Sequence, residues 1–308
     1  MDDWPHLHEL WQRCAGHANA SGTSGLARDH RDIKALYARG ISMEDAMQFL
    51  FQQRPTLAAF QAWLAGRTRV RPAHVASPHQ DVLSAADLRY FEEHGYLVLR
   101  SAVPRAQCAA ARAAIWDYLG ASPDKPASWY QPHPGKRGLM LQFSDHPALE
   151  ENRHCAHIRH ACQQLYGIDT GIYASIDKVS FNPPETPQHR FLGSALHWDV
   201  SLQQPVPFKL QGMLYLSDCP AQHGAFHCVP GFQHRMADWL RQVPPGRQPR
   251  EWAVDNLRPV PVAGMAGDFL LWHQALPHCA TPNRGPVPRL VQYLTYLPDH
   301  CQDQDVWI

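Results

Sequence analysis

The sequence of 308 residues has no long apolar run and no excess of charge of either sign. No stretch approaches the roughly 18 consecutive apolar residues that indicate a membrane-spanning helix, so no membrane partner is expected. Lys plus Arg and Asp plus Glu each number 28, which excludes a globally basic surface for nucleic acid. The opening residues, MDDWPHLHEL, are acidic and interrupted, and we expect no signal peptide there.

Closely spaced cysteine pairs are also missing. The eight cysteines are dispersed and none forms a C-x-x-C motif, which is typical of reduced thiols in a cytoplasmic protein. Charged residues make up 18% of the chain and hydrophobic residues 44%, so a packed core is favoured over disorder. Histidine is abundant, with 20 residues, and together with 27 prolines and 10 tryptophans it suggests loops, strands and a metal site.

The first 66 residues carry apolar side chains at helical spacing. Ser42 and Thr56 stand where N-caps are expected, so residues 1–66 are predicted to form a helical extension. Residues 67–82 lack periodicity and contain two prolines, which predicts a linker. Short helices need a surface to pack on. We expect the extension to pack against the rest of the same chain, either as a structural support or to help close a substrate pocket.

Residues 83–308 are predicted to form a second domain. Ser84 caps a short helix that Gly95 ends, and a helix is expected over 148–166. From about residue 172 the apolar period changes to two, in short segments separated by Gly, Pro and Asn. Many short strands of this kind favour a jelly roll or a related barrel.

One segment, SALHWD (194–199), combines two metal-ligand side chains. On a strand, residues two apart point to the same face, so His197 and Asp199 would project together. An H-x-D pair alone is common by chance, and a third ligand must come from elsewhere; His273 and His278 are the candidates. Two histidines and one carboxylate on one side of a metal are the arrangement used by non-haem Fe(II) oxygenases.

Arg289 supports an anionic cosubstrate. It opens the strand-like segment RLVQYLTYL, 11 residues after His278. A buried arginine is costly unless it pairs with an anion, and its planar fork suits a carboxylate. The alternative is an ordinary surface residue at a strand end after Pro288.

The C-terminal two-thirds of the chain resembles the phytanoyl-CoA dioxygenase family of Fe(II)/2-oxoglutarate oxygenases. The resemblance spans roughly residues 84–298, and order, spacing and chemistry of its motifs agree. The motifs are FEEHGYLVLR (91–100), LHWD (196–199), LYLSD (214–218), GAFHCVPGFQHR (224–235) and GDFLLWHQALPHCATPNRGPVPRLVQYLTY (267–296). This resemblance implies an α+β fold, with a double-stranded β-helix (a cupin-like jelly roll), flanking helices and the N-terminal helical extension.

The resemblance also implies a set of site residues. Iron would be held by His197, Asp199 and His278, because His278 is followed by Pro282 and Asn283 as the family pattern requires. His273 would then be a non-ligand. Arg289 would bind the distal carboxylate of 2-oxoglutarate. The cofactors implied are Fe(II), 2-oxoglutarate and O₂.

Three further cosubstrate contacts are implied by position. Many members carry Ser two residues after the distal His, where this chain has Ala280, and the neighbouring Thr281 is a candidate replacement for that hydroxyl. Tyr215 is the candidate for an aromatic side chain near the cosubstrate. Gln142 lies in a region where the family can supply a polar contact.

The predicted activity is therefore hydroxylation of a small-molecule metabolite, with release of succinate and CO₂. Desaturation, epimerisation or ring formation uses the same cofactors and stays open. The alternative from another class is a metal-dependent cupin-like enzyme that does not use 2-oxoglutarate, and Arg289 argues against it because such an enzyme has no need of this side chain.

Overall fold

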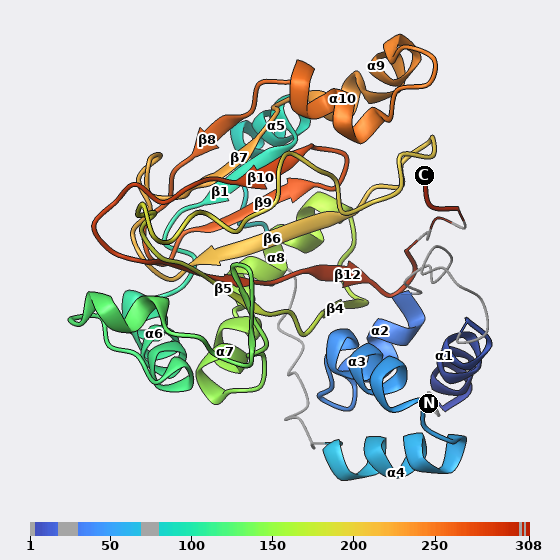
Figure 1. Cartoon of the computed structure of the whole chain (residues 1–308). Helices are drawn as coiled ribbons and strands as arrows, with labels where there is room; N and C mark the ends of the chain where they lie inside the picture. Colours follow the sequence, from blue (N-terminus) through green and yellow to red (C-terminus); the bar gives the residue numbers. More distant parts are fainter. Residues whose placement is uncertain (1–3, 18–29, 69–79, 302–303, 305) are drawn as a thin grey trace.

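A computed structural model of the chain describes residues 4–17, 30–68, 80–301, 304 and 306–308. It has the α+β character that the sequence predicts, with a group of helices at the N-terminal end and a β-rich part after it (Figure 1). No helix in the described residues is long and apolar enough to cross a membrane. The cysteines are all free thiols.

The N-terminal helices have a hydrophobic core of their own. They are α1 (Trp4–His17), α2 (His30–Tyr37), α3 (Met43–Gln53) and α4 (Leu57–Arg67). Ser42 and Thr56 accept hydrogen bonds from main-chain N–H groups three residues later, so both are N-caps. The shared core includes Leu7, Leu10, Leu36, Leu50, Phe60 and Leu64. Helix α4 ends at Arg67 and not at Gly66; most of the predicted linker, residues 69–79, lies outside the described residues.

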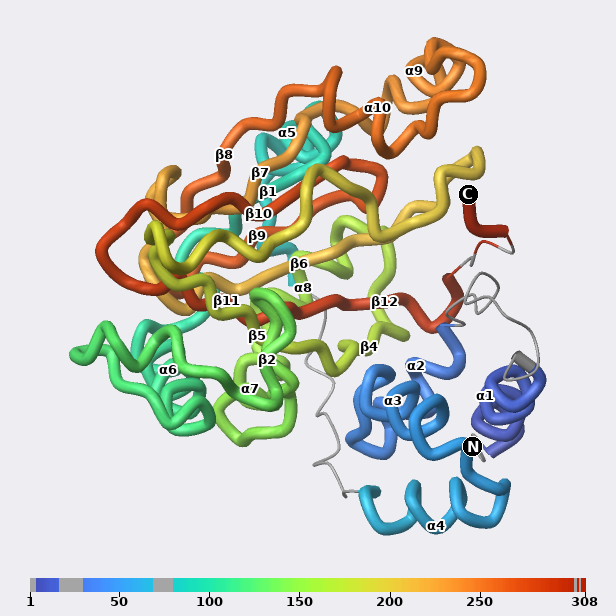
Figure 2. Tube along the Cα trace, viewed as in Figure 1, coloured from blue at the N-terminus to red at the C-terminus, as the bar shows by residue number. Residues whose placement is uncertain are grey.

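Helices α2 and α3 touch the β-rich part of the chain. Figure 2 shows α2 close to β4 (Ile172–Ala174) and β12 (Tyr296–Pro298), and residue contacts join α2 to β4. The polar contacts include Tyr173 Oη donating to His30 O at 2.7 Å, an ion pair of Lys34 with Asp299 at 2.8 Å, Gln142 Nε2 donating to Gln48 Oε1 at 3.2 Å, and an ion pair of Lys178 with Glu44. The extension therefore packs on the same chain.

Antiparallel strands form a large sheet and two small ones. The large sheet has the strand order β1-β9-β6-β11-β5-β3-β2, a second has β10-β7-β8, and β12 pairs with β4. The remaining bounds are β1 (Tyr96–Leu99), β2 (Lys136–Arg137), β3 (Met140–Leu141), β5 (Val179–Asn182), β6 (Leu210–Tyr215), β7 (Phe226–Cys228), β8 (Val260–Val262), β9 (Phe269–His273), β10 (His278–Ala280) and β11 (Arg289–Tyr293).

The register assigns side chains of the large sheet to two faces. Arg289, Val291 and Tyr293 alternate with Leu290 and Gln292, because successive residues of a strand point to opposite sides. One face packs towards the β10-β7-β8 sheet in a core that includes Met213, Tyr215, Phe226, Trp272 and Val291. We call this the inner face. The other, outer face shares a core with helices and includes Phe181, Leu214, Phe269, Leu271 and Leu290.

Helices cover the outer face. They include α5 (Ala85–His94), α6 (Arg105–Leu119), α7 (Pro147–Arg153) and α8 (Ala156–Tyr166), with the short 3₁₀ turn η1 (Pro126–Tyr130). Between β7 and β8 the chain forms η2 (Phe232–His234), α9 (Met236–Gln242) and α10 (Pro249–Asn256). The capping box of Ser84 and Asp87 begins α5, and Gly95 ends it in the left-handed conformation, as predicted.

Two sequence-based expectations are wrong. The helix expected over 148–166 is two helices, because α7 ends before His154 and α8 begins after Cys155. Residues 194–199 form no regular strand; they contain a single antiparallel bridge, between His197 and His278. A strand needs a ladder of partners, and this segment finds a partner at one residue.

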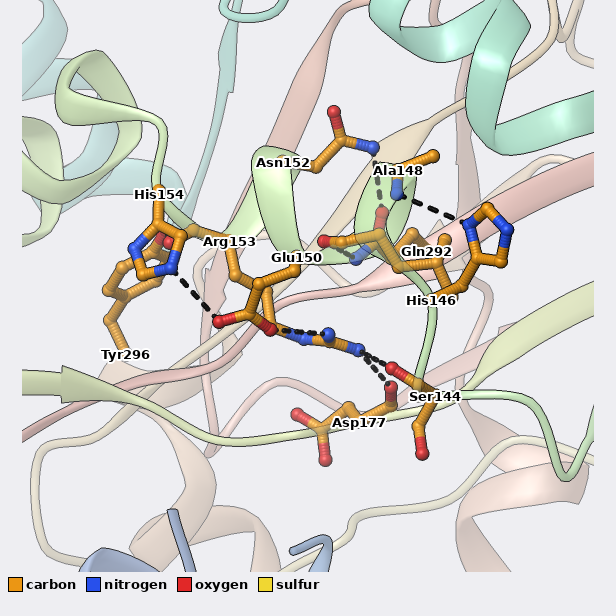
Figure 3. Close-up of polar contacts among 11 residues, drawn as sticks. Ser144, His146, Ala148, Glu150, Asn152, Arg153, His154, Asp177, Gln292 and Tyr296 are labelled. Atoms are coloured by element: carbon orange, nitrogen blue, oxygen red, sulfur yellow. Dashed lines mark hydrogen bonds and ion pairs between the residues drawn. The ribbon is translucent and has the colours of Figure 1, made fainter. Parts of the chain in front are cut away.

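A buried polar network attaches α7 to the sheet strand β11 and to β12 (Figure 3). Asn152 Nδ2 donates to Gln292 Oε1 at 2.8 Å, and Gln292 Nε2 donates to Leu149 O at 2.8 Å. Tyr296 Oη donates to the carbonyl of Arg153 at 2.8 Å. The bonds of Gln292 hold β11 from the outer face of the sheet. The same strand carries Arg289 on the inner face.

The guanidinium of Arg153 joins the same network. It is 1% exposed and donates to Ser144 O at 2.7 Å and Asp177 O at 3.2 Å, and it forms an ion pair with Glu150 at 3.1 Å. Because each acceptor is buried or half-buried, losing this donor leaves carbonyl groups without partners.

We expect Arg153→Met to lower the free energy of unfolding by about 3 kcal/mol, since a buried group left unsatisfied costs roughly 1–3 kcal/mol. Urea unfolding followed by circular dichroism measures it. The control is Arg258→Met, an exposed arginine that donates to main-chain carbonyls at the end of α10. Equal stability of the two variants would show that the network is not needed.

Candidate metal and cosubstrate site

Main-chain hydrogen bonds bring the predicted metal ligands together. His197 N donates to His278 O at 3.0 Å, and His278 N donates to His197 O at 2.9 Å. This bridge joins the irregular segment that contains His197 to His278, the first residue of β10. Asp199 lies two residues after His197 in the same irregular segment. The three side chains offer ligand atoms that all lie within 4.8 Å of one another.

The two imidazoles and the carboxylate face a common point. His278 Nε2 lies 3.2 Å from Asp199 Oδ2, and His197 Nε2 lies 3.6 Å from Asp199 Oδ1. The ring centroids of the two histidines are 4.7 Å apart. Both Nε2 atoms and both carboxylate oxygens are therefore directed inward, as one metal ion would require.

The other nitrogen of each imidazole is held by a main-chain carbonyl. His197 Nδ1 lies 2.8 Å from Ala195 O, and His278 Nδ1 lies 3.1 Å from Leu276 O. A carbonyl accepts a hydrogen bond, so Nδ1 of each ring is the donor and Nε2 is the atom that a metal would bind. This is the arrangement that metal-binding histidines adopt.

Local electrostatics favours the protonation states that a metal needs. Burial lowers the pKa of His197, and His278 lowers it further, against a smaller opposing effect of Asp199. For Asp199, burial opposes ionisation, but the hydrogen bond and charge of His278, the charge of His197 and the bond from Gln211 together hold its pKa below the usual range. Of the two histidines, His197 is thus held towards its neutral form, beside an ionised Asp199 carboxylate.

Gln211 was not singled out by the sequence. Its Nε2 donates to Asp199 Oδ2 at 2.9 Å, while its Oε1 accepts from Trp272 Nε1 at 2.9 Å. The register places Gln211 opposite Trp272 on the inner face. The indole therefore orients the amide, and the amide orients the carboxylate. Alternation in FKLQGMLYL puts Gln211 on the same face as Tyr215, but its contact with Asp199 has no sequence signal.

His273 lies on the outer face, away from this cluster. It follows Trp272 in β9, so its side chain points to the opposite side of the sheet. Burial, and then the neighbouring His234, lower its pKa to about 4. Its Nδ1 accepts a hydrogen bond from Ala275 N at 2.9 Å. The structure therefore brings His278 to His197 and Asp199, and leaves His273 out.

Arg289 is buried on the inner face, with 2% exposure. Its Nη1 donates to Gly224 O at 2.8 Å and its Nη2 to Ser180 Oγ at 3.0 Å, but its Nε is buried without a partner. In the part of the chain that the structure describes, no carboxylate forms an ion pair with it. Gly224 has a φ of 74°, and a Cβ there would lie 2.3 Å from Asn182 Nδ2, so this turn requires glycine.

Tyr293 lies beside Arg289 and was also missed. Burial raises the pKa of Tyr293, while the charge of Arg289 and hydrogen bonds with Arg289 and Ser180 oppose that shift. Arg289 and Tyr293 are four residues apart in β11, so both are on the inner face. The alternation in RLVQYL could have identified this tyrosine from sequence.

The three other residues predicted to contact the cosubstrate form hydrogen bonds with other protein groups. Tyr215 is buried on the inner face, but its hydroxyl donates to Val262 O at 2.5 Å. The Thr281 hydroxyl donates to Ala225 O at 3.4 Å. The Gln142 amide contacts Gln48 of α3. Each hydroxyl or amide therefore has a protein partner, and the roles predicted for these three residues stay predictions.

Comparison with known protein families shows which family the chain belongs to. The family model described as phytanoyl-CoA dioxygenase (PhyH) matches residues 91–291, which is more than half of the chain. The chain belongs to the PhyH family. The cofactors of this family are Fe(II), 2-oxoglutarate and O₂, and its core is a jelly roll, in agreement with the two facing antiparallel sheets. A search of curated protein sequences found no match.

Solved structures agree on the fold. The carbocyclase SnoK, non-haem and α-ketoglutarate-dependent, from nogalamycin biosynthesis, is 20% identical with a TM-score of 0.54 over 75% of this chain and 89% of its own. EvdO2 from Micromonospora carbonacea var. aurantiaca, complexed with 2-oxoglutarate, is 17% identical with a TM-score of 0.53, over 75% and 96%. The α-ketoglutarate-dependent epimerase SnoN is 18% identical with a TM-score of 0.50, over 69% and 81%.

We expect Gln211→Leu to weaken divalent-metal affinity about tenfold, because loss of a group that orients a ligand costs roughly 10–100-fold. Trp272→Phe removes the indole donor but leaves the amide bond to Asp199, so a smaller loss is expected. Titration with Co(II) measures both. An unchanged affinity in Gln211→Leu would show that the carboxylate does not depend on this amide.

Proposed function

We propose that this chain is an Fe(II)/2-oxoglutarate-dependent dioxygenase that hydroxylates a small-molecule metabolite, with release of succinate and CO₂. The observation that carries the proposal is a buried arginine without a carboxylate partner in the described residues, on the inner face that packs towards a His–Asp–His cluster. The arginine and the cluster are both needed for this proposal, since a set of metal ligands alone is common to many barrel enzymes.

His197, Asp199 and His278 are the proposed iron ligands. Their Nε2 atoms and carboxylate oxygens converge, and their Nδ1 atoms are held by carbonyls. Three ligands on one side would leave room on the other side of a bound metal for a cosubstrate and O₂. Trp272 and Phe226 pack against the His278 ring, with centroids 5.2 and 5.4 Å away, and limit its rotation.

Arg289 is the proposed partner of the distal carboxylate of 2-oxoglutarate. Two of its donors are already used by Gly224 O and Ser180 Oγ, which fix the plane of the guanidinium. The remaining edge, with the partnerless Nε, is available for a carboxylate. This feature favours 2-oxoglutarate chemistry over a cupin-like enzyme without it, in which a buried, unpaired cation would only destabilise the fold.

When bound, Fe(II) and 2-oxoglutarate supply the O₂-dependent oxidation of the substrate. The chain's own contribution is to hold the cosubstrate by Arg289, with Tyr215, Thr281 and Gln142 as further proposed contacts. Hydroxylation is the default outcome of this chemistry. The neighbours SnoK and SnoN are a carbocyclase and an epimerase, so the shared fold accommodates other outcomes.

We also propose the domain division and setting expected from the sequence. Residues 83–308 would form the catalytic domain, a double-stranded β-helix, with residues 1–66 as an extension and a cytoplasmic location. The separate hydrophobic core of the N-terminal helices supports this division.

The metal assignment predicts a contrast between two histidines. His278→Ala should lose Fe(II) affinity and turnover, because two remaining ligands hold a labile divalent ion poorly. His273→Ala should retain both, since His273 faces the other side of the sheet. Anaerobic Fe(II) titration of the two variants decides between them. Loss of binding in His273→Ala together with normal binding in His278→Ala would reverse the assignment.

The cosubstrate assignment predicts that Arg289→Ala weakens 2-oxoglutarate binding on the order of 2–5 kcal/mol, the cost of removing a buried charge-assisted partner. Arg289→Lys keeps the charge without the fork and should fall between it and the unmodified protein. The measurements are binding of 2-oxoglutarate to the Fe(II)-loaded protein and succinate formation. Unchanged affinity in Arg289→Ala would remove 2-oxoglutarate from the proposal.

The reaction itself is tested by incubating the Fe(II)-loaded chain with 2-oxoglutarate, O₂ and a metabolite mixture. A substrate that gains one oxygen atom while succinate forms in equal amount supports hydroxylation. A product of unchanged oxygen content, formed with succinate, would show desaturation, epimerisation or ring formation instead.

A further inference from the structure

The carboxylate ligand is carried by a segment without regular structure. After the bridge at His197 the chain from Trp198 to Val200 has no strand partner, and the side chain of Asp199 is 54% exposed. An exposed carboxylate on an irregular segment has conformational freedom that a metal site must restrict. Gln211 restricts the side chain of Asp199. The main chain around Asp199 must be held by other contacts.

Arg250 of α10 holds the main chain on both sides of Asp199. Its Nη1 donates to Trp198 O at 2.8 Å, and its Nη2 donates to Val200 O at 2.8 Å. The planar guanidinium thus spans the residue between them, as a two-pronged donor with fixed geometry. Neither carbonyl belongs to a helix or a strand, so these bonds replace the ladder that the segment lacks.

The environment of Arg250 supports a fixed position. The guanidinium lies over the Trp307 ring, 5.1 Å from its centroid, and Nη2 also donates to Ile308 O at 3.1 Å. In the described residues no Asp or Glu side chain forms an ion pair with it, whereas Arg241 and Arg247 nearby each pair with an aspartate. The donors of Arg250 are therefore directed to the metal-ligand segment and to the tail, and not to an acidic side chain.

We infer that Arg250 is a positioning residue for the metal site: its fork across the carbonyls of Trp198 and Val200 sets the orientation of Asp199. The inference rests on the proposed function, because it requires Asp199 to be a metal ligand. Gln211 and Arg250 then act on the same residue from two sides, one through its carboxylate and the other through the carbonyls of the residues before and after it.

The test is Co(II) binding to the full-length chain, measured by titration and by the visible absorption spectrum of the bound ion. Arg250→Met keeps the length of the side chain and removes all donors; it should weaken Co(II) affinity about 10–100-fold and change the spectrum. Arg250→Lys keeps the charge and can reach one carbonyl, so its affinity should be intermediate. Arg258→Met, at the end of the same helix, should behave like the unmodified protein.

A second measurement separates positioning from a general loss of stability. In an Asp199→Ala background, titrated at Co(II) concentrations high enough to saturate the weakened two-histidine site, Arg250→Met should cause no further loss of Co(II) affinity, because the residue that it positions is absent. An equal loss in both backgrounds would overturn the inference, and so would unmodified affinity and spectrum in Arg250→Lys. If Arg250→Met is unfolded by circular dichroism, Arg250→Lys decides alone.

Co(II) binding by the unmodified chain and by the variants tests the metal site and the role of Arg250 separately. If the unmodified chain binds no Co(II), or binds it equally well after His278→Ala, the metal site itself is wrong. If the unmodified chain binds Co(II) through His278 but Arg250→Met and Arg250→Lys bind it equally well, the site stands and the role of Arg250 does not.

Discussion

Two main-chain hydrogen bonds between His197 and His278 bring together the residues that we propose as metal ligands. They join a segment that has no other strand-like pairing to the first residue of β10, and they place two imidazoles side by side. Each ring is then oriented by a carbonyl two residues before it. One bridge thus positions side chains that regular strand pairing would otherwise position. The surrounding side chains provide the remaining contacts.

Because the segment around Asp199 has only this one bridge, other polar groups hold Asp199 in place. Gln211 fixes its carboxylate, and Trp272 fixes the amide of Gln211. Arg250 binds the peptide groups on either side. These contacts come from β6, β9 and α10, so three separate elements converge on one exposed aspartate. Groups beyond the direct ligands often tune metal sites in this way.

The sequence predicts local structure best where the signal is local. The Ser84 capping box and Gly95 mark a helix and the strand after it, and both are present. Residues 194–199 read as a strand because alternation is a property of the sequence, but pairing is not. The same limit hides Gln211 and Arg250, because their partners are 12 and about 50 residues away in the chain.

Strand β11 shows how firmly the site is tied to the rest of the fold. A slip of its register by one residue would move Arg289 and Tyr293 among the helices and would turn Gln292 to the inner face. Most strands resist such a slip through an apolar face alone. Here polar side chains on both faces have fixed partners, Gly224 and Ser180 on one and Asn152 and Leu149 on the other. Alternative registers are thus penalised twice, and the contacts that place Arg289 come from the protein itself.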